Sequence, residues 1–196
     1  MADIDIELML DIKAGSKSAF NKLVKRHQRT VINFFYKNLW DKSQAEDLAQ
    51  ELFLRLFKSA KNYQPQAKFT TFMYRIARNL LIDYYRTTRN KPSTVSLQGG
   101  TGSGNEDDLQ IIETISSDES APGQHSESDE IGEAIQDAIS RLPEDQRIVF
   151  IMGEFEQMQY KEIAKALDIP IGTVKSRMHA AFMKLRILLA KYSPDD

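Results

Sequence analysis

A chain of 196 residues, 41% hydrophobic and 28% charged, has the composition of a globular protein and can form one medium domain or two small ones. Because it has no cysteine and its three histidines lie far apart in sequence, no disulfide, no metal site and no cofactor is predicted. The N-terminus is acidic where a signal peptide is basic, and no apolar run approaches the roughly 18 residues of a membrane span, so we expect a cytoplasmic protein.

The net charge of −2 conceals an uneven distribution along the chain. Residues 1–91 carry 17 basic and 9 acidic side chains, residues 92–133 carry no basic and 10 acidic ones, and residues 134–196 carry 9 of each. This order favours a polyanion-binding domain joined to a tether that avoids or mimics polyanions. A solvated surface followed by a disordered acidic linker is the alternative explanation.

The first 91 residues have apolar side chains at the spacing of amphipathic helices. Ser43 and Glu46 have the spacing of a capping box that opens a helix, and Thr70 or Thr71 is expected to cap the following helix. Strand-like alternation is absent, so we predict a compact helical domain. The apolar positions include Ile6, Met9, Ile12, Phe20, Leu23, Val24, Val31, Phe34, Phe35, Leu48, Leu52, Phe53, Leu56 and Phe57.

One face of the helix expected to begin at Ser43 is acidic and polar. At 100° per residue, Asp47, Gln50, Glu51 and Leu54 share this face. Carboxylates repel the phosphates of DNA, so the face is better suited to a basic protein partner.

The next predicted helix, TTFMYRIARNLLIDYYRTTRN, combines cations with aromatic rings. Its basic side carries Arg75, Arg78, Arg86 and Arg89, and its packing side is predicted to carry Phe72, Ile76 and Leu80. The preceding loop adds Tyr63, Lys68 and Phe69. Rings that stack on unpaired bases, beside cations that meet the backbone, are typical of a single-stranded nucleic acid site. The alternative is that the rings belong to the core, which is favoured for Phe72 and open for Tyr63, Phe69, Tyr84 and Tyr85.

Residues 92–128 are rich in Ser, Gly, Asp and Glu and contain no aromatic residue. Such a segment cannot bury enough apolar surface to offset the entropy lost on ordering. We therefore predict a flexible acidic linker between two domains.

Helical periodicity resumes in the last part of the chain, which is predicted to form a second domain over residues 129–196. One stripe joins Ile131, Ile135, Ala138, Ile139 and Leu142, and the proline that follows is expected to be the first residue of a new helix. Two further helices are predicted in YKEIAKAL and from about residue 171 to 191. The domain is therefore a small bundle of about four helices.

The segment YKEIAKALDIPIGTVKSR has the pattern of a helix-turn-helix motif. Small Ala164 allows two helices to cross closely, Asp168 tolerates a left-handed turn conformation, and Val174 fills the angle between the helices. A helical hairpin inside a packing domain remains the alternative.

The second helix of this motif has one apolar and one polar side. With Val174 at 0°, Met178, Ala181 and Leu185 fall within about 40° of it, so this stripe is predicted to be buried. Ser176, His179 and Ala180 point away from the core, with Lys175 and Arg177 on opposite flanks. Such a helix fits the major groove of DNA, with its polar side chains at base edges and its cations at the phosphates.

Four segments, in this order along the chain, resemble one known family. They are AEDLAQELFLRLF, FTTFMYRIARNLLIDYYR, LPEDQRIVF and YKEIAKALDIPIGTVKSRMHAAFMKLR. Together they resemble an extracytoplasmic-function (ECF, group 4) sigma factor of the sigma-70 family, a bacterial subunit of transcription initiation. The resemblance covers both predicted domains and implies an all-α fold, with sigma region 2 in residues 1–91 and sigma region 4 in residues 129–196.

The resemblance also implies three binding surfaces. The β′ coiled coil of core RNA polymerase would bind region 2 at Asp47, Gln50, Glu51, Leu54 and Phe57. The minus-10 element would be melted and bound by Tyr63, Lys68, Phe69, Thr71, Arg75, Arg78 and Asn79. The minus-35 element would be bound as duplex by Thr173, Lys175, Ser176, Arg177, His179 and Ala180.

Ala180 departs from the family pattern, which usually has a basic residue at this position. An apolar contact between Ala180 and a thymine methyl would give this position its own base preference.

By the resemblance, the chain is a sigma factor that binds core polymerase through the β′ coiled coil and the β flap, recognises both promoter elements and promotes DNA melting. It is expected to be no enzyme, to take no small-molecule substrate, and to be controlled by an anti-sigma factor. Two alternatives remain: a helix-turn-helix regulator that acts without polymerase, and a helical adaptor that resembles an anti-sigma factor.

Overall fold

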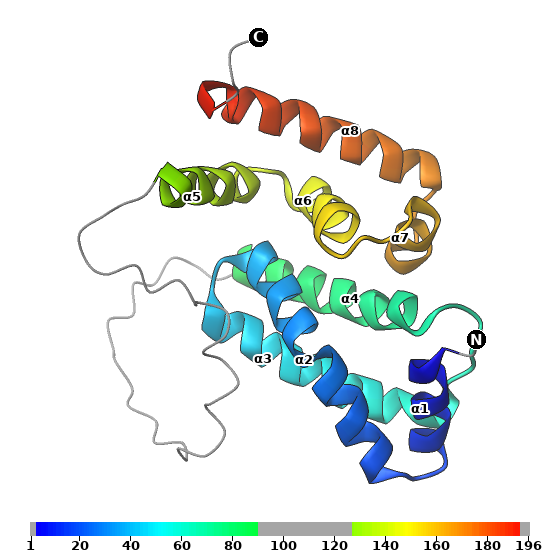
Figure 1. The fold of residues 1–196 in the computed structure, drawn as a ribbon. Helices are drawn as coiled ribbons and strands as arrows, with labels where there is room; N and C mark the ends of the chain where they lie inside the picture. Colours follow the sequence, from blue (N-terminus) through cyan, green and yellow to red (C-terminus); the bar gives the residue numbers. More distant parts are fainter. Residues whose placement is uncertain (1–2, 90–126, 193–196) are drawn as a thin grey trace, which may run out of the picture.

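The computed structural model describes residues 3–89 and 127–192. The described residues form helices and no strand, which confirms the predicted all-α fold (Figure 1). Most of the linker predicted for residues 92–128 lies outside the described residues.

The first half of the chain forms four helices around one core. Ser16 caps α2, because its hydroxyl accepts a hydrogen bond from the Ala19 amide at 3.2 Å. The largest fully buried side chains include Leu23, Phe34 and Phe69. The elements are α1 (Ile4–Lys13), α2 (Lys17–Leu39), α3 (Lys42–Ser59), a 3-10 turn η1 (Ala60–Asn62) and α4 (Phe69–Arg89).

Two predicted caps in this half are wrong. α3 begins one residue before Ser43, and its cap is Asp41, whose carboxylate accepts a hydrogen bond from the Gln44 amide at 3.0 Å. Aspartate and serine are comparably good N-cap residues, so the nearby Ser43 was an equally plausible start. Thr70 and Thr71 lie inside the first turn of α4, which begins at residue 69.

The second half of the chain contains the four predicted helices and a π-helical turn. Pro143 is the N-cap of α6, so it lies one residue before its predicted place in the helix. Ala138, Ile139 and Leu142 of the predicted stripe are buried. The elements are α5 (Glu127–Ser140), α6 (Glu144–Phe150), the π turn η3 (Ile151–Phe155), α7 (Tyr160–Leu167), α8 (Ile171–Leu188) and a 3-10 turn η4 (Ala190–Tyr192).

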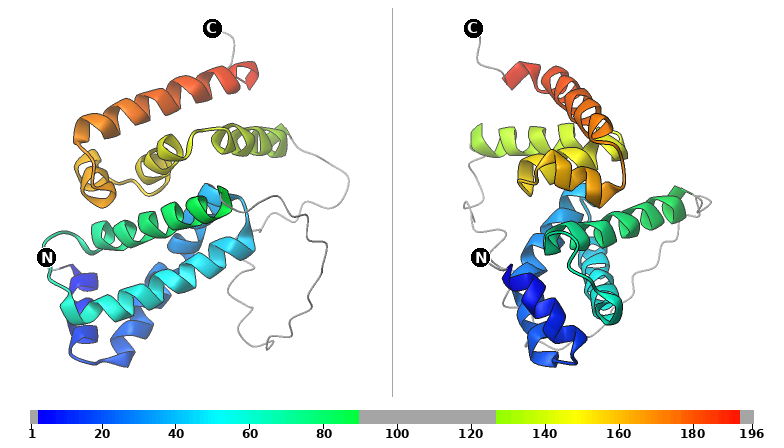
Figure 2. Two further views of the ribbon diagram at one scale, coloured as in Figure 1. Left: turned by 180° about the vertical axis from the view of Figure 1, so that it is seen from behind. Right: turned by 90° about the vertical axis from the view of Figure 1, so that its right-hand side faces the viewer.

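The two halves lie against each other, as the three views in Figures 1 and 2 show. α4 packs along α7, and α2 contacts α6 and η3. The buried side chains of both halves form one continuous hydrophobic cluster. This packing joins the two predicted domains along α4. The contact was not predicted from the sequence.

Candidate nucleic-acid interface

α7 and α8 form a helix-turn-helix. The turn between them depends on Asp168, which has the left-handed conformation (φ 53°, ψ 51°) predicted for it. The amide of Ile169 donates to the carbonyl of Ala164 at 3.1 Å and closes the end of α7. Val174 is fully buried, so it fills the angle between the helices as expected. The local sequence thus determines both the turn of the motif and the residue that packs between its two helices.

α8 turns a polar face to solvent, because its apolar stripe is taken up by the core. Met178, Ala181 and Leu185 are buried, as the helical periodicity predicts. Among the predicted minus-35 residues, three are exposed and three are half-buried. The exposed residues are Lys175, Ser176 and His179, and the half-buried ones are Thr173, Arg177 and Ala180.

Two of these side chains already have partners in the structure. The Ser176 hydroxyl donates to the Thr173 carbonyl at 3.0 Å, which leaves the oxygen free to accept. The Arg177 guanidinium is paired with the Asp145 carboxylate of α6 at 3.1 Å. Lys175 and Arg177 therefore differ: the first is exposed to solvent, and the second is held by a carboxylate of α6.

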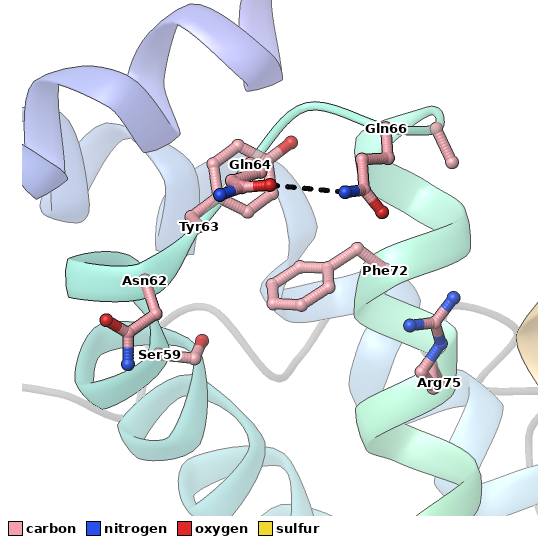
Figure 3. Close-up of a pocket in the computed structure, with 8 residues that line it drawn as sticks. Ser59, Asn62, Tyr63, Gln64, Gln66, Phe72 and Arg75 are labelled. Carbon is pink, nitrogen blue, oxygen red and sulfur yellow. Dashed lines mark hydrogen bonds between the residues drawn. The ribbon is translucent and has the colours of Figure 1, made fainter.

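A pocket of about 310 Å³ lies between the loop after α3 and the start of α4 (Figure 3). The ring of Phe72 and the guanidinium of Arg75 approach it from α4, and Asn62 approaches it from η1. Aromatic, amide and cationic groups around one hollow are suited to an unstacked base and its phosphate. The lining residues are Ser59, Asn62, Tyr63, Gln64, Gln66, Ala67, Phe72 and Arg75.

The structure corrects several of the residues predicted for the minus-10 element. Phe69 and Thr71 are 0% and 1% exposed, so their side chains belong to the core and offer no surface to DNA. Tyr63 is 3% exposed and presents only part of its ring to the pocket. Phe72 packs half-buried against the core, as predicted, and it also lines the pocket, with its ring centroid 5.1 Å from that of Tyr63. Phe72 therefore offers the pocket an aromatic ring, and Phe69 does not.

The polar residues of this set lie in three different environments. Arg75 is exposed at the pocket, and Asn79 is exposed one turn further along α4. Lys68 forms an ion pair of 2.6 Å with Glu162 of α7. This hydrogen-bonded contact raises the pKa of Lys68 and lowers the pKa of Glu162. Arg78 is half-buried and lines a different cavity, between α4 and the second half of the chain.

Helix α1 and its N-cap residue Asp3 hold both ends of the pocket loop, a role that the sequence did not indicate. The Lys13 ammonium donates to the Tyr63 carbonyl at 3.0 Å. The Asp3 carboxylate accepts from the Phe69 amide at 3.4 Å. These contacts join residues 50 and 66 positions apart in sequence, which no periodicity can detect.

The face of α3 predicted to bind polymerase is open to solvent. Asp47 and Gln50 are exposed, as are the apolar side chains of Leu54 (53%) and Phe57 (46%). Glu51 is half-buried and pairs with Arg55 at 2.7 Å. An acidic rim beside two exposed apolar side chains is a surface suited to a protein partner.

Residues 3–89 and 127–192 also bear on membrane and metal binding. There, no helix combines the length and the apolar character needed to cross a membrane. The same residues contain no group of three or more His, Asp or Glu side chains placed to hold a metal ion.

The fold and its surfaces define an all-helical protein with a helix-turn-helix in one half and a base-sized pocket in the other. Comparisons with known proteins agree: residues 23–91 match the family described as Sigma-70 region 2, and residues 132–185 match Sigma-70, region 4. The chain therefore belongs to the sigma-70 family, and its relatives are ECF sigma factors.

Two relatives illustrate this similarity. The ECF RNA polymerase sigma factor SigW of Bacillus subtilis is 32% identical over 89% of this chain and 91% of its own length. The RNA polymerase sigma-H factor of Pseudomonas aeruginosa is 30% identical over 90% of this chain and 89% of its own length.

Two solved structures share the fold. CnrH, in complex with the cytosolic domain of CnrY, covers 97% of this chain and 100% of its own, with a TM-score of 0.69 and 19% identity. The sigma factor RpoE from Bartonella quintana, in complex with the anti-sigma factor NepR, covers 87% of this chain and 96% of its own, with a TM-score of 0.60 and 18% identity.

Proposed function

We propose that this chain is an alternative sigma factor that binds core RNA polymerase, recognises minus-35 and minus-10 promoter elements, and initiates transcription of a specific set of genes. The observation that carries the proposal is the pairing of an exposed basic recognition helix with a base-sized aromatic pocket on the other half of the chain. One surface suits duplex DNA and the other suits an unpaired base. A protein that opens a promoter needs both.

The division of labour follows from these two surfaces. α8 holds the chain on duplex DNA by neutralising phosphates and contacting base edges. The pocket then lowers the free energy of the melted state by holding a base that has left the stack. RNA synthesis belongs to the polymerase, so we propose that the chain itself is no enzyme and acts in the cytoplasm, where it meets the polymerase.

The partners follow from the family. We assign the β′ coiled coil to the exposed face of α3 and the β flap to region 4. An anti-sigma factor is a further expected partner, because the printed descriptions of the two solved structures name CnrY with CnrH and the anti-sigma factor NepR with RpoE.

Run-off transcription with core polymerase on a library of randomised promoters tests the proposal. We expect transcripts that depend on this chain and that share one sequence near minus-35 and another near minus-10. DNA binding that does not depend on polymerase, without transcripts, would instead identify a helix-turn-helix regulator. If the chain neither bound DNA nor supported transcription, the helical adaptor would be the remaining explanation.

Lys175→Ala is expected to weaken duplex binding and to make it less dependent on salt. Lys175 is exposed on the flank of α8, so its ammonium is placed to release a counterion from one phosphate. The slope of log affinity against log salt should fall by about one. Titrations at several salt concentrations measure this, with Lys22→Ala, at an exposed position of α2, as the control. An unchanged slope would contradict a phosphate contact.

His179→Asn is expected to change which minus-35 sequence is preferred. His179 is exposed on the outer face of α8, and asparagine pairs well with adenine in the major groove. Selection from a library should show a shift of about tenfold at one base pair. Ile187→Asn, in the last turn of the same helix, is the control because Ile187 is 74% exposed. If the selected sequences match those of the wild type, His179 makes no base contact.

A further inference from the structure

The arginine cavity, a space of about 410 Å³ beside α4, is separate from the base pocket. Four arginines line it: Arg78, Arg86 and Arg89 from α4, and Arg177 from α8. Among the described residues of its lining, two are acidic, so the walls carry an excess of positive charge. A concave site with such an excess attracts anions.

Two of the four arginines are paired with the acidic residues of the lining. Arg89 pairs with Glu144 at 2.9 Å, and Arg177 pairs with Asp145 at 3.1 Å. The Arg177 side chain is 29% exposed, so water screens its charge less than it screens an ordinary surface arginine. An anion that contacts Arg177 therefore gains a stronger charge-assisted hydrogen bond than it would on an open surface.

The other two arginines have no carboxylate partner among the described residues that line the cavity. Arg78 donates to the side-chain oxygen of Asn79 at 3.1 Å, and Arg86 pairs with Asp83 of its own helix at 3.2 Å. A guanidinium has five N–H donors, so both arginines keep donors for a further partner. The fork of these donors matches two oxygens of one phosphate.

The remaining lining residues form an apolar wall. The ring of Tyr85 is fixed there, because its hydroxyl donates to the Asn38 carbonyl at 3.2 Å. A small inorganic anion would leave this wall wet, and an apolar ligand would leave the guanidiniums without a partner. The lining therefore suits a molecule that has phosphates at one end and an apolar ring at the other. The wall consists of Leu81, Ile82, Tyr85, Ile148, Leu167 and Ile169.

We propose that the arginine cavity binds a free nucleotide, with its phosphates on the arginines and its base on the apolar wall. The volume of the cavity lies in the range of about 300–1,000 Å³ that is usual for small-molecule sites. A DNA duplex is too large for it, since its major groove alone is about 12 Å wide. The nucleotide site is also distinct from the base pocket, because the two linings share no residue.

A nucleotide in this cavity would compete with promoter DNA for two side chains. Arg78 belongs to the set predicted for the minus-10 element, and Arg177 belongs to the set predicted for the minus-35 element. A guanidinium whose donors hold a nucleotide phosphate cannot give the same donors to a DNA phosphate. This part of the inference rests on the function proposed above. Promoter binding is therefore expected to weaken as the nucleotide concentration rises.

Calorimetric titration of the full chain with ADP and with GDP tests the site. We expect at least one of them to bind with a Kd below about 0.1 mM. Pyrophosphate should bind about tenfold more weakly, because it leaves the apolar wall uncovered. Adenosine and guanosine should not bind measurably, because they carry no phosphate. Absence of binding by both ADP and GDP would overturn the proposal.

Arg86→Gln is expected to weaken binding of the nucleotide about tenfold. Arg86 is exposed and its ion pair lies within α4, so the fold does not depend on it. Arg141→Gln is the matched control: Arg141 is also exposed, pairs with Asp137 of its own helix at 2.9 Å, and lies outside the cavity lining. An equal loss of affinity in both variants would indicate attraction by net charge alone and would contradict this site.

Asp145→Asn is expected to change the affinity in the opposite direction. It removes the carboxylate that competes for Arg177, so the nucleotide should bind up to about fivefold more tightly. Asp137→Asn, which removes the carboxylate paired with Arg141, is the control and should have no effect. A residue needed only for packing would lower the affinity when it is changed. Unchanged or weaker binding in Asp145→Asn would therefore contradict a phosphate on Arg177.

Ile82→Ala tests the position of the base. Ile82 lies on the apolar wall and is 44% exposed, so its truncation should leave the fold intact. We expect the nucleotide to bind about fivefold more weakly and pyrophosphate to bind as before. Ile131→Ala, at an equally exposed position outside the cavity, is the control. Equal losses for the nucleotide and pyrophosphate would show that the base does not lie on this wall.

Fluorescence anisotropy of a labelled minus-35 duplex measures the competition. With the nucleotide at ten times its own Kd, the duplex affinity of the wild type should fall about tenfold, and that of Arg86→Gln should fall much less. An unchanged duplex affinity would overturn the competition. Failure of the proposed function would look different: the chain would bind the nucleotide with the same variant effects, but no promoter would be transcribed in the run-off assay.

Discussion

Replacing Asp47 with arginine is expected to weaken the binding of core RNA polymerase about a hundredfold. Asp47 is exposed on the acidic face of α3, beside the exposed side chains of Leu54 and Phe57. If this face contacts a basic surface of the polymerase, the arginine that replaces Asp47 would lie unpaired beside groups of the same positive charge. The proposed polymerase contact therefore predicts that reversing this one charge is enough to weaken binding.

The fold should be unaffected by this change. Asp47 lies on the solvent side of α3, and arginine forms helices more readily than aspartate. Glu51 is a less informative position, because Glu51→Arg also breaks the pair with Arg55. Titration of labelled core polymerase measures the affinity, and Glu7→Arg, at an exposed position of α1, makes the same change of charge elsewhere. Equal affinities of the wild type and Asp47→Arg would remove the assignment of this face.

The helix-turn-helix could be predicted from the sequence because its determinants are local. Asp168 sets the turn, Val174 fills the crossing, and the buried stripe of α8 recurs at helical spacing. All of these lie within one short segment, so a pattern of residue types is enough to define them. The exposure of Lys175, Ser176 and His179 then follows from the same helical wheel.

The pocket on the first half was less predictable, because α4 is buried on two sides. One side faces the core of the first half, and the other faces α7. A single sequence shows that rings such as Phe69, Phe72 and Tyr74 are present but not which side each one takes. Phe69 was predicted to contact DNA but is fully buried, whereas Phe72, predicted to pack, is half-buried against the core and also lines the pocket.

Contacts between distant residues were missed for a related reason. Lys13 and Asp3 hold the pocket loop, and Glu156 and Glu162 meet α4, yet none of these pairs leaves a periodic trace in the sequence. Only the folded chain shows that Glu162 pairs with Lys68, a cation that was predicted to contact DNA.

Phe72→Leu is expected to weaken binding of a single-stranded minus-10 oligonucleotide about tenfold. Leucine keeps the apolar contact with the half-buried surroundings but removes the flat ring on which a base would stack. Because no charge is lost, the salt dependence of binding should stay the same. Arg75→Ala at the same pocket should instead reduce that dependence.

Fluorescence anisotropy of the oligonucleotide at several salt concentrations separates these two effects. Phe182→Leu is the control, since Phe182 is 45% exposed on α8 and lies outside the pocket. Loss of affinity in Phe72→Leu with an unchanged salt slope would support stacking of a base in the pocket. Unchanged affinity, with an effect of Arg75→Ala alone, would make the pocket a phosphate site and would leave the melted base to be held elsewhere on α4.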